Sequence, residues 1–514
     1  MKTIITIFFI VLASSLFAQS INYEINTSKT FKQKNNNLIE DYKLIYENDK
    51  YYFIDLRPSE NHHSIVKITK DFKNSTKKTL ELSKKTTDEI ASRLGDNIVV
   101  INKVHSSKEN TNTINIKTIN KTTLSIEESD DLYIQKEGKY DFMLKFSVEE
   151  SEDKSKLAIL YTQYTKKKDA YKFGILVIND DLEIIWHEDN FSPQFRGTYN
   201  QEDFFVSNNG DVFLIGRVIQ NPDNNPEAVK FSRGNIISGY YTYKVDNPEY
   251  KYQIYRISDD GSSTDYINLE IPNYDIRNIR IDIKGEIITA YGIYRNMGSI
   301  DALGCFISEI DIDAETLKMI DIKAFTKKMI TEGFNEKELS AYNKRKTKGN
   351  ILDPYNYELS NLKYKDNGEA YFIAEQRLFG HKETTDYKMT NFDFNDIYVV
   401  DLNQEKNIEN INKISKRQNY PYPWFLSYSE IFSEDTHYLI FNTTVKHKLK
   451  KCILASLNND NNKEIIELMK YKNRSAQGFI SLKNCITEPS LFLYVKSDIM
   501  LGRNFSIETL RINE

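Results

Sequence analysis

The sequence predicts an all-β fold, a β-propeller of seven or eight blades, from three observations. Eight short and nearly continuous apolar stretches are distributed along the chain. Each is followed by a second strand-like stretch that ends in polar turn residues. The residues that precede the apolar stretches recur at intervals of about 47 to 83 residues, which is roughly the length of a propeller blade. Eight hairpins favour eight blades over seven.

The apolar stretches are expected to be strands that are covered on both faces. Continuous runs of aliphatic and aromatic residues are typical of strands buried between neighbouring layers. These strands are predicted at Tyr51–Leu56, Ile98–Ile101, Leu157–Tyr161, Val212–Ile215, Ile287–Tyr291, Ala370–Ala374, Tyr438–Phe441 and Leu491–Val495. Each buries about four or five apolar side chains at roughly 1.5 to 3 kcal/mol apiece, so they should form the core.

The stretches that follow are predicted to be the second strands of the hairpins. Many of them alternate apolar and polar residues, as Tyr252–Ile257 does, which marks a strand with one face in water. The second strands are expected at Ser64–Ile68, Thr113–Ile119, Phe173–Ile178, Tyr252–Ile257, Cys305–Ile312, Ile397–Leu402, Cys452–Leu457 and Phe505–Leu510. An outer strand is expected after some of them, for example at Leu182–Trp186 and Leu317–Ile322.

Glycine marks three of the turns that precede apolar strands. Gly210, Gly285 and Gly368 each stand between polar residues just before the strand begins. Glycine adopts positive φ at little cost, so these turns define the beginning of their strands most clearly.

Two segments interrupt the repeat. Residues 220–249 are rich in Asn, Pro and Tyr and are predicted to be a long loop between paired strands. Residues 324–349 are predicted to be a short helical insertion, in which Asn335 and Glu338 form a capping box and Gly349 ends the helix.

Residues 1–18 are predicted to be a secretory signal peptide. Lys2 precedes an apolar run, and the segment ends at Ala18. Its apolar part, about 14 residues, is shorter than the roughly 20 that cross a bilayer. No later segment is apolar enough to cross a membrane, and no cysteine lies near the cleavage region. We therefore expect a secreted or periplasmic protein with no membrane span, in which residues 19–514 form a single propeller domain.

Charge and cysteine content narrow the possible partners and cross-links. The net charge of −5 is small and evenly spread, so no nucleic-acid partner is expected. The three cysteines, Cys305, Cys452 and Cys485, show neither C-x-x-C nor zinc-ligand spacing. A disulfide between Cys452 and Cys485 and buried free thiols are the two alternatives.

No established catalytic or cofactor motif occurs in the sequence. G-x-S-x-G, H-E-x-x-H, P-loop and G-x-G-x-x-G patterns are all missing. His62 and His63 are adjacent, and neighbours on an extended segment point apart, so no metal site is expected. We expect no cofactor. Catalytic residues stay unassigned, because 74 acidic residues offer too many candidate carboxylate pairs.

Basic residues follow several of the apolar strands, at one predicted rim of the propeller. Loops at one face of a propeller usually hold the ligand site, and Arg binds carboxylate, sulfate or phosphate through paired hydrogen bonds. The candidate ligand-binding residues are Arg217, Arg295, Glu375, Gln376 and Arg377, with Tyr422 and Trp424 as an aromatic platform. The alternative explanations are that loop tips are simply polar and that Pro-flanked aromatic residues only fix a loop.

The stretch from about Phe325 to Tyr428 resembles a group of uncharacterised secreted bacterial proteins with β-propeller-like repeats. Four segments carry the resemblance: Tyr355–Leu359, Tyr371–Gln376, Asp396–Val400 and Lys416–Gln418. It covers roughly a fifth of the chain and implies a propeller fold but no reaction. Arg377 and Leu378 stand where similar sequences usually have a tyrosine pair.

Three functions are compatible with the sequence. The first is a secreted scaffold that binds an extracellular protein, peptide or anionic glycan on its top face. The alternative is an extracellular hydrolase or lyase acting on a polysaccharide or peptide, and a structural role in the cell envelope is a third. Propellers serve all of these, so the fold does not choose between them. Clustered carboxylates near the axis, with a His or Tyr, would favour an enzyme, and a flat aromatic or basic surface would favour binding.

Overall fold

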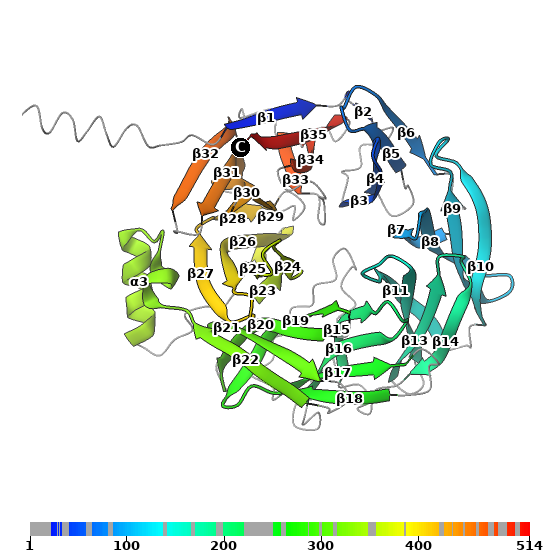
Figure 1. Cartoon of the computed structure of the whole chain (residues 1–514), viewed down its shortest axis with the longest axis horizontal. Helices are drawn as coiled ribbons and strands as arrows, with labels where there is room; N and C mark the ends of the chain where they lie inside the picture. The colour runs from blue at the N-terminus through cyan, green and yellow to red at the C-terminus, as the bar shows by residue number, and fades with distance from the viewer. Residues whose placement is uncertain are drawn as a thin grey trace, which may run out of the picture.

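The computed structural model describes most of the chain between Asn22 and Asn513. The gaps are 28, 30, 33–40, 58–63, 81–85, 137–140, 166–169, 192–198, 220–249, 259–263, 286, 298–300, 312–315, 348–355, 385–386, 421–425, 434, 446–447, 459–461, 471–476, 482–490 and 499–503. Within the described residues the strands form eight antiparallel sheets that follow one another around a ring (Figure 1). The predicted all-β propeller is therefore confirmed, and we number its sheets as blades 1 to 8.

The first four blades follow the chain in order. Blade 1 contains β3 (Asp41–Glu47), β4 (Tyr51–Arg57), β5 (Ser64–Thr69) and β6 (Ser75–Thr79). Blade 2 contains β7 (Thr86–Leu94), β8 (Asn97–Ser106), β9 (Thr111–Ile119) and β10 (Ile126–Lys136). Blade 3 contains β11 (Asp141–Glu150), β12 (Lys156–Thr165), β13 (Ala170–Asn179) and β14 (Ile184–Phe191). Blade 4 contains β15 (Tyr199–Val206), β16 (Val212–Ile219), β17 (Tyr250–Ile257) and β18 (Thr264–Leu269).

The last four blades include the closing sheet. Blade 5 contains β19 (Tyr274–Lys284), β20 (Ile287–Asn296), β21 (Ala302–Asp311) and β22 (Thr316–Ala324). Blade 6 contains β23 (Asn356–Leu359), β24 (Lys363–Tyr364), β25 (Ala370–Thr384), β26 (Tyr387–Leu402), β27 (Ile408–Ile414) and β28 (Gln418–Tyr420). Blade 7 contains β29 (Tyr428–Ser433), β30 (Thr436–Val445), β31 (Lys448–Asn458) and β32 (Lys463–Lys470). Blade 8 contains β33 (Gln477–Ser481), β34 (Leu491–Asp498) and β35 (Asn504–Asn513), together with β1 (Asn22–Thr27) and β2 (Phe31–Lys32).

The eight predicted hairpins are the middle strands of the eight blades. In blade 3, the residues from Leu157 to Tyr161 are all buried because β12 is paired on both edges and packed on both faces. The strands that lie nearest the axis were not predicted from the sequence: β3, β7, β11, β15, β19, β23, β29 and β33 (Figure 1). The described side chains of these innermost strands lie around the centre of the ring.

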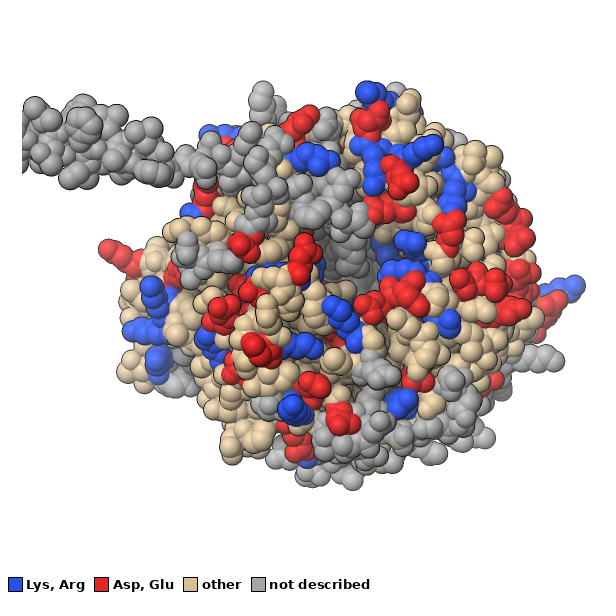
Figure 2. Space-filling view, in the orientation of Figure 1, with Lys and Arg blue, Asp and Glu red and all other residues tan. Residues whose placement is uncertain are grey.

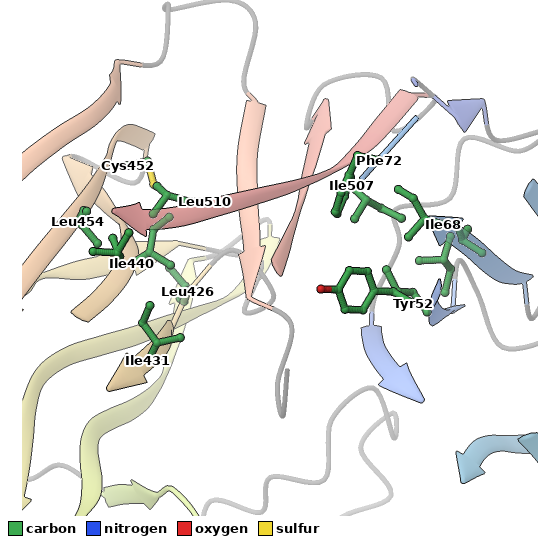
Figure 3. Close-up of a cluster of buried hydrophobic side chains, with 14 of the residues drawn as sticks. Tyr52, Ile68, Phe72, Leu426, Ile431, Ile440, Cys452, Leu454, Ile507 and Leu510 are labelled. Atoms are coloured by element: carbon green, nitrogen blue, oxygen red, sulfur yellow. The ribbon is translucent and has the colours of Figure 1, made fainter. Parts of the chain in front are cut away.

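Blade 8 joins the two ends of the described chain. β1 pairs with β35 in antiparallel register, which places Ile25 opposite Leu510. Side chains of β35 then fill the space between blades 7 and 1, where Ile507 and Leu510 are completely buried (Figure 3). Closure of the ring thus depends on strands from opposite ends of the sequence.

The three glycine turns and the capped helical part of the second insertion are confirmed in the structure. Gly210, Gly285 and Gly368 have φ of 102°, 60° and 87°, as the turns require. The insertion contains α2 (Lys327–Thr331) and α3 (Glu336–Thr347). Asn335 Oδ1 accepts from Glu338 N at 3.0 Å, and Glu338 Oε2 accepts from Asn335 N at 2.9 Å, so the predicted capping box forms.

Some predictions fall outside the described residues: the signal peptide at 1–18, the pair His62 and His63, the loop at 220–249, the helix end at Gly349, Cys485, and the pair Tyr422 and Trp424. Cys305 is a buried free thiol and Cys452 is buried. Among the residues that the structure describes, no helix has the length and apolar character needed to cross a membrane.

Candidate functional site

Charged side chains gather around the axis of the propeller. The innermost strands border the centre of the ring, and Figure 2 shows acidic and basic side chains intermingled near the centre of this face. We define the channel cluster as Lys43, Glu149, Glu150, Asp203 and Arg280, which lie on the innermost strands β3, β11, β15 and β19.

Contacts inside the channel cluster cross from blade to blade. Lys43 Nζ of blade 1 lies 3.5 Å from Glu150 Oε1 of blade 3. Ser92 of the intervening blade 2 donates its hydroxyl to the same carboxylate. A side chain reaches past a whole blade most easily where the blades converge, so these contacts indicate the inner edge of the ring. Arg280 Nε lies 3.9 Å from Asp203 Oδ2, which links blades 4 and 5.

The cluster is fixed in place but keeps contact with solvent. The side chains of Asp203 and Arg280 are 30% and 27% exposed. Arg280 Nη1 donates to Leu359 O of blade 6 at 3.0 Å, which orients the guanidinium. These groups are therefore held by protein partners while part of their surface stays accessible to a ligand.

Two adjacent carboxylates have different acidities. Burial, together with the negative charge of Asp203, raises the pKa of Glu149 to about 7, against the opposing effect of Lys43 and Arg280. Burial acts in the same direction on Glu150, but Lys43, Lys154 and hydrogen bonds from Ser92 and from Arg93 N lower the pKa of this group overall. Near neutral pH, Glu149 can thus hold or release a proton while Glu150 stays ionised.

The predicted residues Glu375, Gln376 and Arg377 lie together on β25, inside blade 6. Glu375 is completely buried and accepts from Arg377 Nε at 2.9 Å and from Ser427 Oγ at 2.8 Å. Arg377 Nη1 also lies 3.1 Å from Glu358 Oε2 on the innermost strand β23. Gln376 Nε2 donates to Tyr357 Oη at 3.1 Å. Their described contacts are with the protein itself.

Lys416 completes this buried network. It is completely buried, donates to Glu375, and lies 2.7 Å from Gln418 Oε1. Burial lowers the pKa of Lys416 to about 8, while the negative charge of Glu375 opposes that shift. The resemblance motif that ends at Gln376 and the one that begins at Lys416 therefore meet in the fold as partners of one ion network.

The three predicted arginines lie on β16, β20 and β25, the apolar strands of the hairpins of three successive blades. Arg217 is half-buried on β16, and Arg295 is buried on β20 with Nη2 3.5 Å from Asp275 Oδ2. Arg377 lies on β25 of blade 6. Ligand binding by these residues stays a prediction.

Sequence reasoning missed the channel cluster because it missed the innermost strands. A signal was present, since Glu149 and Glu150 end a stretch of alternating residues just before a polar turn that begins at Ser151. Among the described residues, no group of three or more His, Cys, Asp or Glu is arranged to hold a metal ion.

Solved structures match this chain with low sequence identity and low TM-scores. No protein-family model matches the sequence, and no curated protein is significantly similar to it. The β-propeller domain of the trilobed protease from Pyrococcus furiosus matches with 14% identity and a TM-score of 0.34, over 85% of this chain and 98% of that one. The α-L-arabinofuranosidase Arb93A from Fusarium graminearum matches with 11% identity and a TM-score of 0.31, over 73% and 93% of the two chains.

Prolyl oligopeptidase B from Galerina marginata matches with 8% identity and a TM-score of 0.39, over 93% of this chain. The match spans 55% of the length of the oligopeptidase. At these values, no activity is transferred from the matched proteins to this chain.

Proposed function

We propose that the protein binds a polar extracellular ligand, a peptide or a glycan, in the centre of the propeller at the channel cluster. The observation that carries this proposal is a set of partly exposed acids and bases on the innermost strands, held in place by contacts between blades. Hydrogen bonds to charged groups contribute about 1.5 to 3 kcal/mol each, so a few of them give measurable affinity. Groups that are already oriented lose little conformational entropy on binding.

The charge of the cluster favours a ligand with donors as well as acceptors. Three carboxylates and two cations compose it. Arg377, which is not part of the channel cluster, forms ion pairs with Glu375 and Glu358. These pairs reduce the net attraction that Arg377 can exert on an anionic ligand. A neutral glycan or a zwitterionic peptide fits this balance better than a polyanion.

Binding can be tested with a glycan array and a peptide library, followed by calorimetry on any probe that binds. We expect Asp203→Asn and Arg280→Gln to weaken binding at least tenfold without changing the melting temperature by more than a few degrees. Glu270→Gln is the matched control, because Glu270 directly follows the outermost strand β18 of blade 4 and pairs with Lys251 of β17. Equal binding by wild type and both channel variants would refute the proposal.

A second candidate is hydrolysis of a polysaccharide or peptide. It is favoured by the Glu149–Asp203 pair, in which one carboxyl has its pKa raised to about 7 by burial and by the charge of the other. A protonated carboxyl can act as general acid toward a leaving group, while an ionised carboxylate activates water. Release of reducing ends or free amines from polysaccharide and peptide panels would test it. Activity should disappear in Glu149→Gln and decline above about pH 7, and no turnover on any panel would leave binding as the function.

A further inference from the structure

The helical insertion of α2 and α3 forms a separate surface on the outside of the ring, beside β27 of blade 6 (Figure 1). Its attachment is specific. Buried Lys413 Nζ donates to Ile330 O at 2.9 Å, and Ser415 Oγ donates to Glu332 O at 3.1 Å. Lys463 of blade 7 also forms an ion pair with Glu332. The insertion is therefore a fixed part of the outer wall.

Apart from Leu339, the large apolar side chains of the insertion are turned toward the protein. Phe325 and Tyr342 are buried, and Phe334 makes an edge contact with Tyr342 at 6.1 Å between ring centroids. The acidic side chains Glu332 and Glu338 are engaged too. Glu338 caps α3 and lies 3.6 Å from Arg417 Nη2. Attachment thus uses both the apolar residues and two of the acids.

Most of the exposed charged side chains on the outer face of α2 and α3 are lysines. The exposed cations of the insertion are Lys327, Lys328, Lys337, Lys344 and Lys346, and Figure 2 shows a group of basic side chains at this edge of the molecule. Lys337 and Lys344 are seven residues apart on α3, about two helical turns, so they point to the same side. This basic surface stands on a chain whose net charge is −5.

The chemistry of this surface selects among anionic partners. A helix that inserts into a membrane surface presents a row of apolar residues to the lipid. Among the large apolar side chains of the described insertion, Leu339 alone is exposed, at 39%, so α2 and α3 present no such row. Proteins that bind single-stranded nucleic acid also use aromatic side chains on which the bases stack. Tyr342 of α3 is buried, so it does not provide a stacking surface. Flexible lysines without a stacking surface suit a partner recognised by charge density alone.

We propose that the outer face of α2 and α3 docks an acidic polysaccharide, sulfated or rich in uronic acid, independently of the channel. Attraction by solvated lysines is screened within about 8 Å at physiological ionic strength, so binding should be strong at low salt and lost at high salt.

The test measures binding of dextran sulfate and alginate to the whole protein at 50 mM and 500 mM salt. The variant Lys337→Glu/Lys344→Glu/Lys346→Glu should bind at least tenfold more weakly at low salt. The control variant Lys78→Glu/Lys108→Glu/Lys318→Glu makes the same change of net charge at exposed lysines on blades 1, 2 and 5 and should bind nearly as wild type does. Unchanged melting temperatures confirm that both variants fold.

Three results would overturn the proposal: no binding of either polysaccharide by wild type, equal loss in the two triple variants, or tighter binding of duplex DNA or of anionic lipid vesicles. The channel variant Asp203→Asn should leave dextran sulfate binding unchanged, which separates this surface from the channel cluster.

Discussion

The ring of Tyr161 occupies the space that a side chain on Gly174 would need. The two residues are direct partners on the paired strands β12 and β13. A Cβ atom on Gly174 would lie 1.9 Å from Tyr161 Cζ. The ring is held across the neighbouring strand because its hydroxyl donates to Asp189 Oδ1 at 2.7 Å and lies 2.6 Å from His187 Nε2. Tyr133 of blade 2 stacks on the same ring, so this glycine permits a contact between blades 2 and 3.

Gly174→Ala should therefore destabilise the protein by about 1 to 3 kcal/mol through overpacking, measured by denaturant unfolding. The double variant Tyr161→Leu/Gly174→Ala removes the ring from this position and should be less unstable than the sum of the two single changes. Additive effects would show that the ring and the glycine are not coupled.

The buried pair of Glu375 and Lys416 should be costly to break from one side. Lys416→Met leaves the Glu375 carboxylate with Arg377 and Ser427 alone. Loss of one partner of a buried ion pair costs about 3 to 5 kcal/mol. The double variant Glu375→Gln/Lys416→Met should recover part of this loss. Lys251→Met, at an exposed ion pair, should change the free energy of unfolding by no more than about 0.5 kcal/mol. Equal effects of Lys251→Met and Lys416→Met would contradict the buried network.

Glu149 should make stability depend on pH in a defined window. Its pKa is about 7 in the folded protein against a normal value of 4.5, because of burial and the charge of Asp203. The folded state then binds more protons than the unfolded state between these values. The contribution of Glu149 is present below pH 4.5 and is lost as the pH rises to 7, by at most about 1.4 kcal/mol per pH unit.

The measurement is the free energy of unfolding of wild type minus that of Glu149→Gln, from pH 4 to pH 8. Subtraction removes the other groups that titrate in this range. We expect the difference to fall as pH rises and to level off above pH 7. A difference that is flat or increases with pH would show that Glu149 is ionised in the usual range.

Deletion of β1 should open the ring. Without Asn22–Thr27, the edge of β35 exposes unpaired backbone groups, which promotes association with other chains. The deletion also removes Tyr23, which packs against the cluster that contains Ile507 and Leu510. We expect a lower melting temperature and oligomers in size-exclusion chromatography. Ile25→Ser, at a residue that is 39% exposed, should leave the melting temperature and the oligomeric state as they are in wild type. Identical behaviour of the deletion variant and wild type would mean that closure does not depend on β1.

The apolar strands of the middle hairpins could be predicted from sequence where they are buried on both faces, as in blade 3. Leu157–Tyr161 has apolar neighbours on both faces, so every position must be apolar and the pattern is visible without coordinates. The turn at Gly210 was predictable for a similar reason, since its positive φ restricts the residue type.

The innermost strands were not predictable in the same way. One edge of β11 borders the centre of the ring, so it mixes Phe146, a core residue, with Glu149 and Glu150. Mixed strands resemble loops or amphipathic segments when they are considered alone. The roles of Glu375 and Arg377 were hidden for another reason, because burial of a charged residue depends on partners elsewhere in the chain.

The sequence alone was enough to predict the repeated hairpin, the propeller class, the glycine turns and the capped helix. Each of these follows from local backbone preference or from uniform burial. Tertiary structure alone decided which charges meet: Lys43 with Glu150 across a blade, Arg280 with Asp203, and Lys416 with Glu375. The physical reason is that ring closure brings distant segments within a few ångströms of each other, and electrostatic interactions depend on that distance and on burial rather than on separation along the chain.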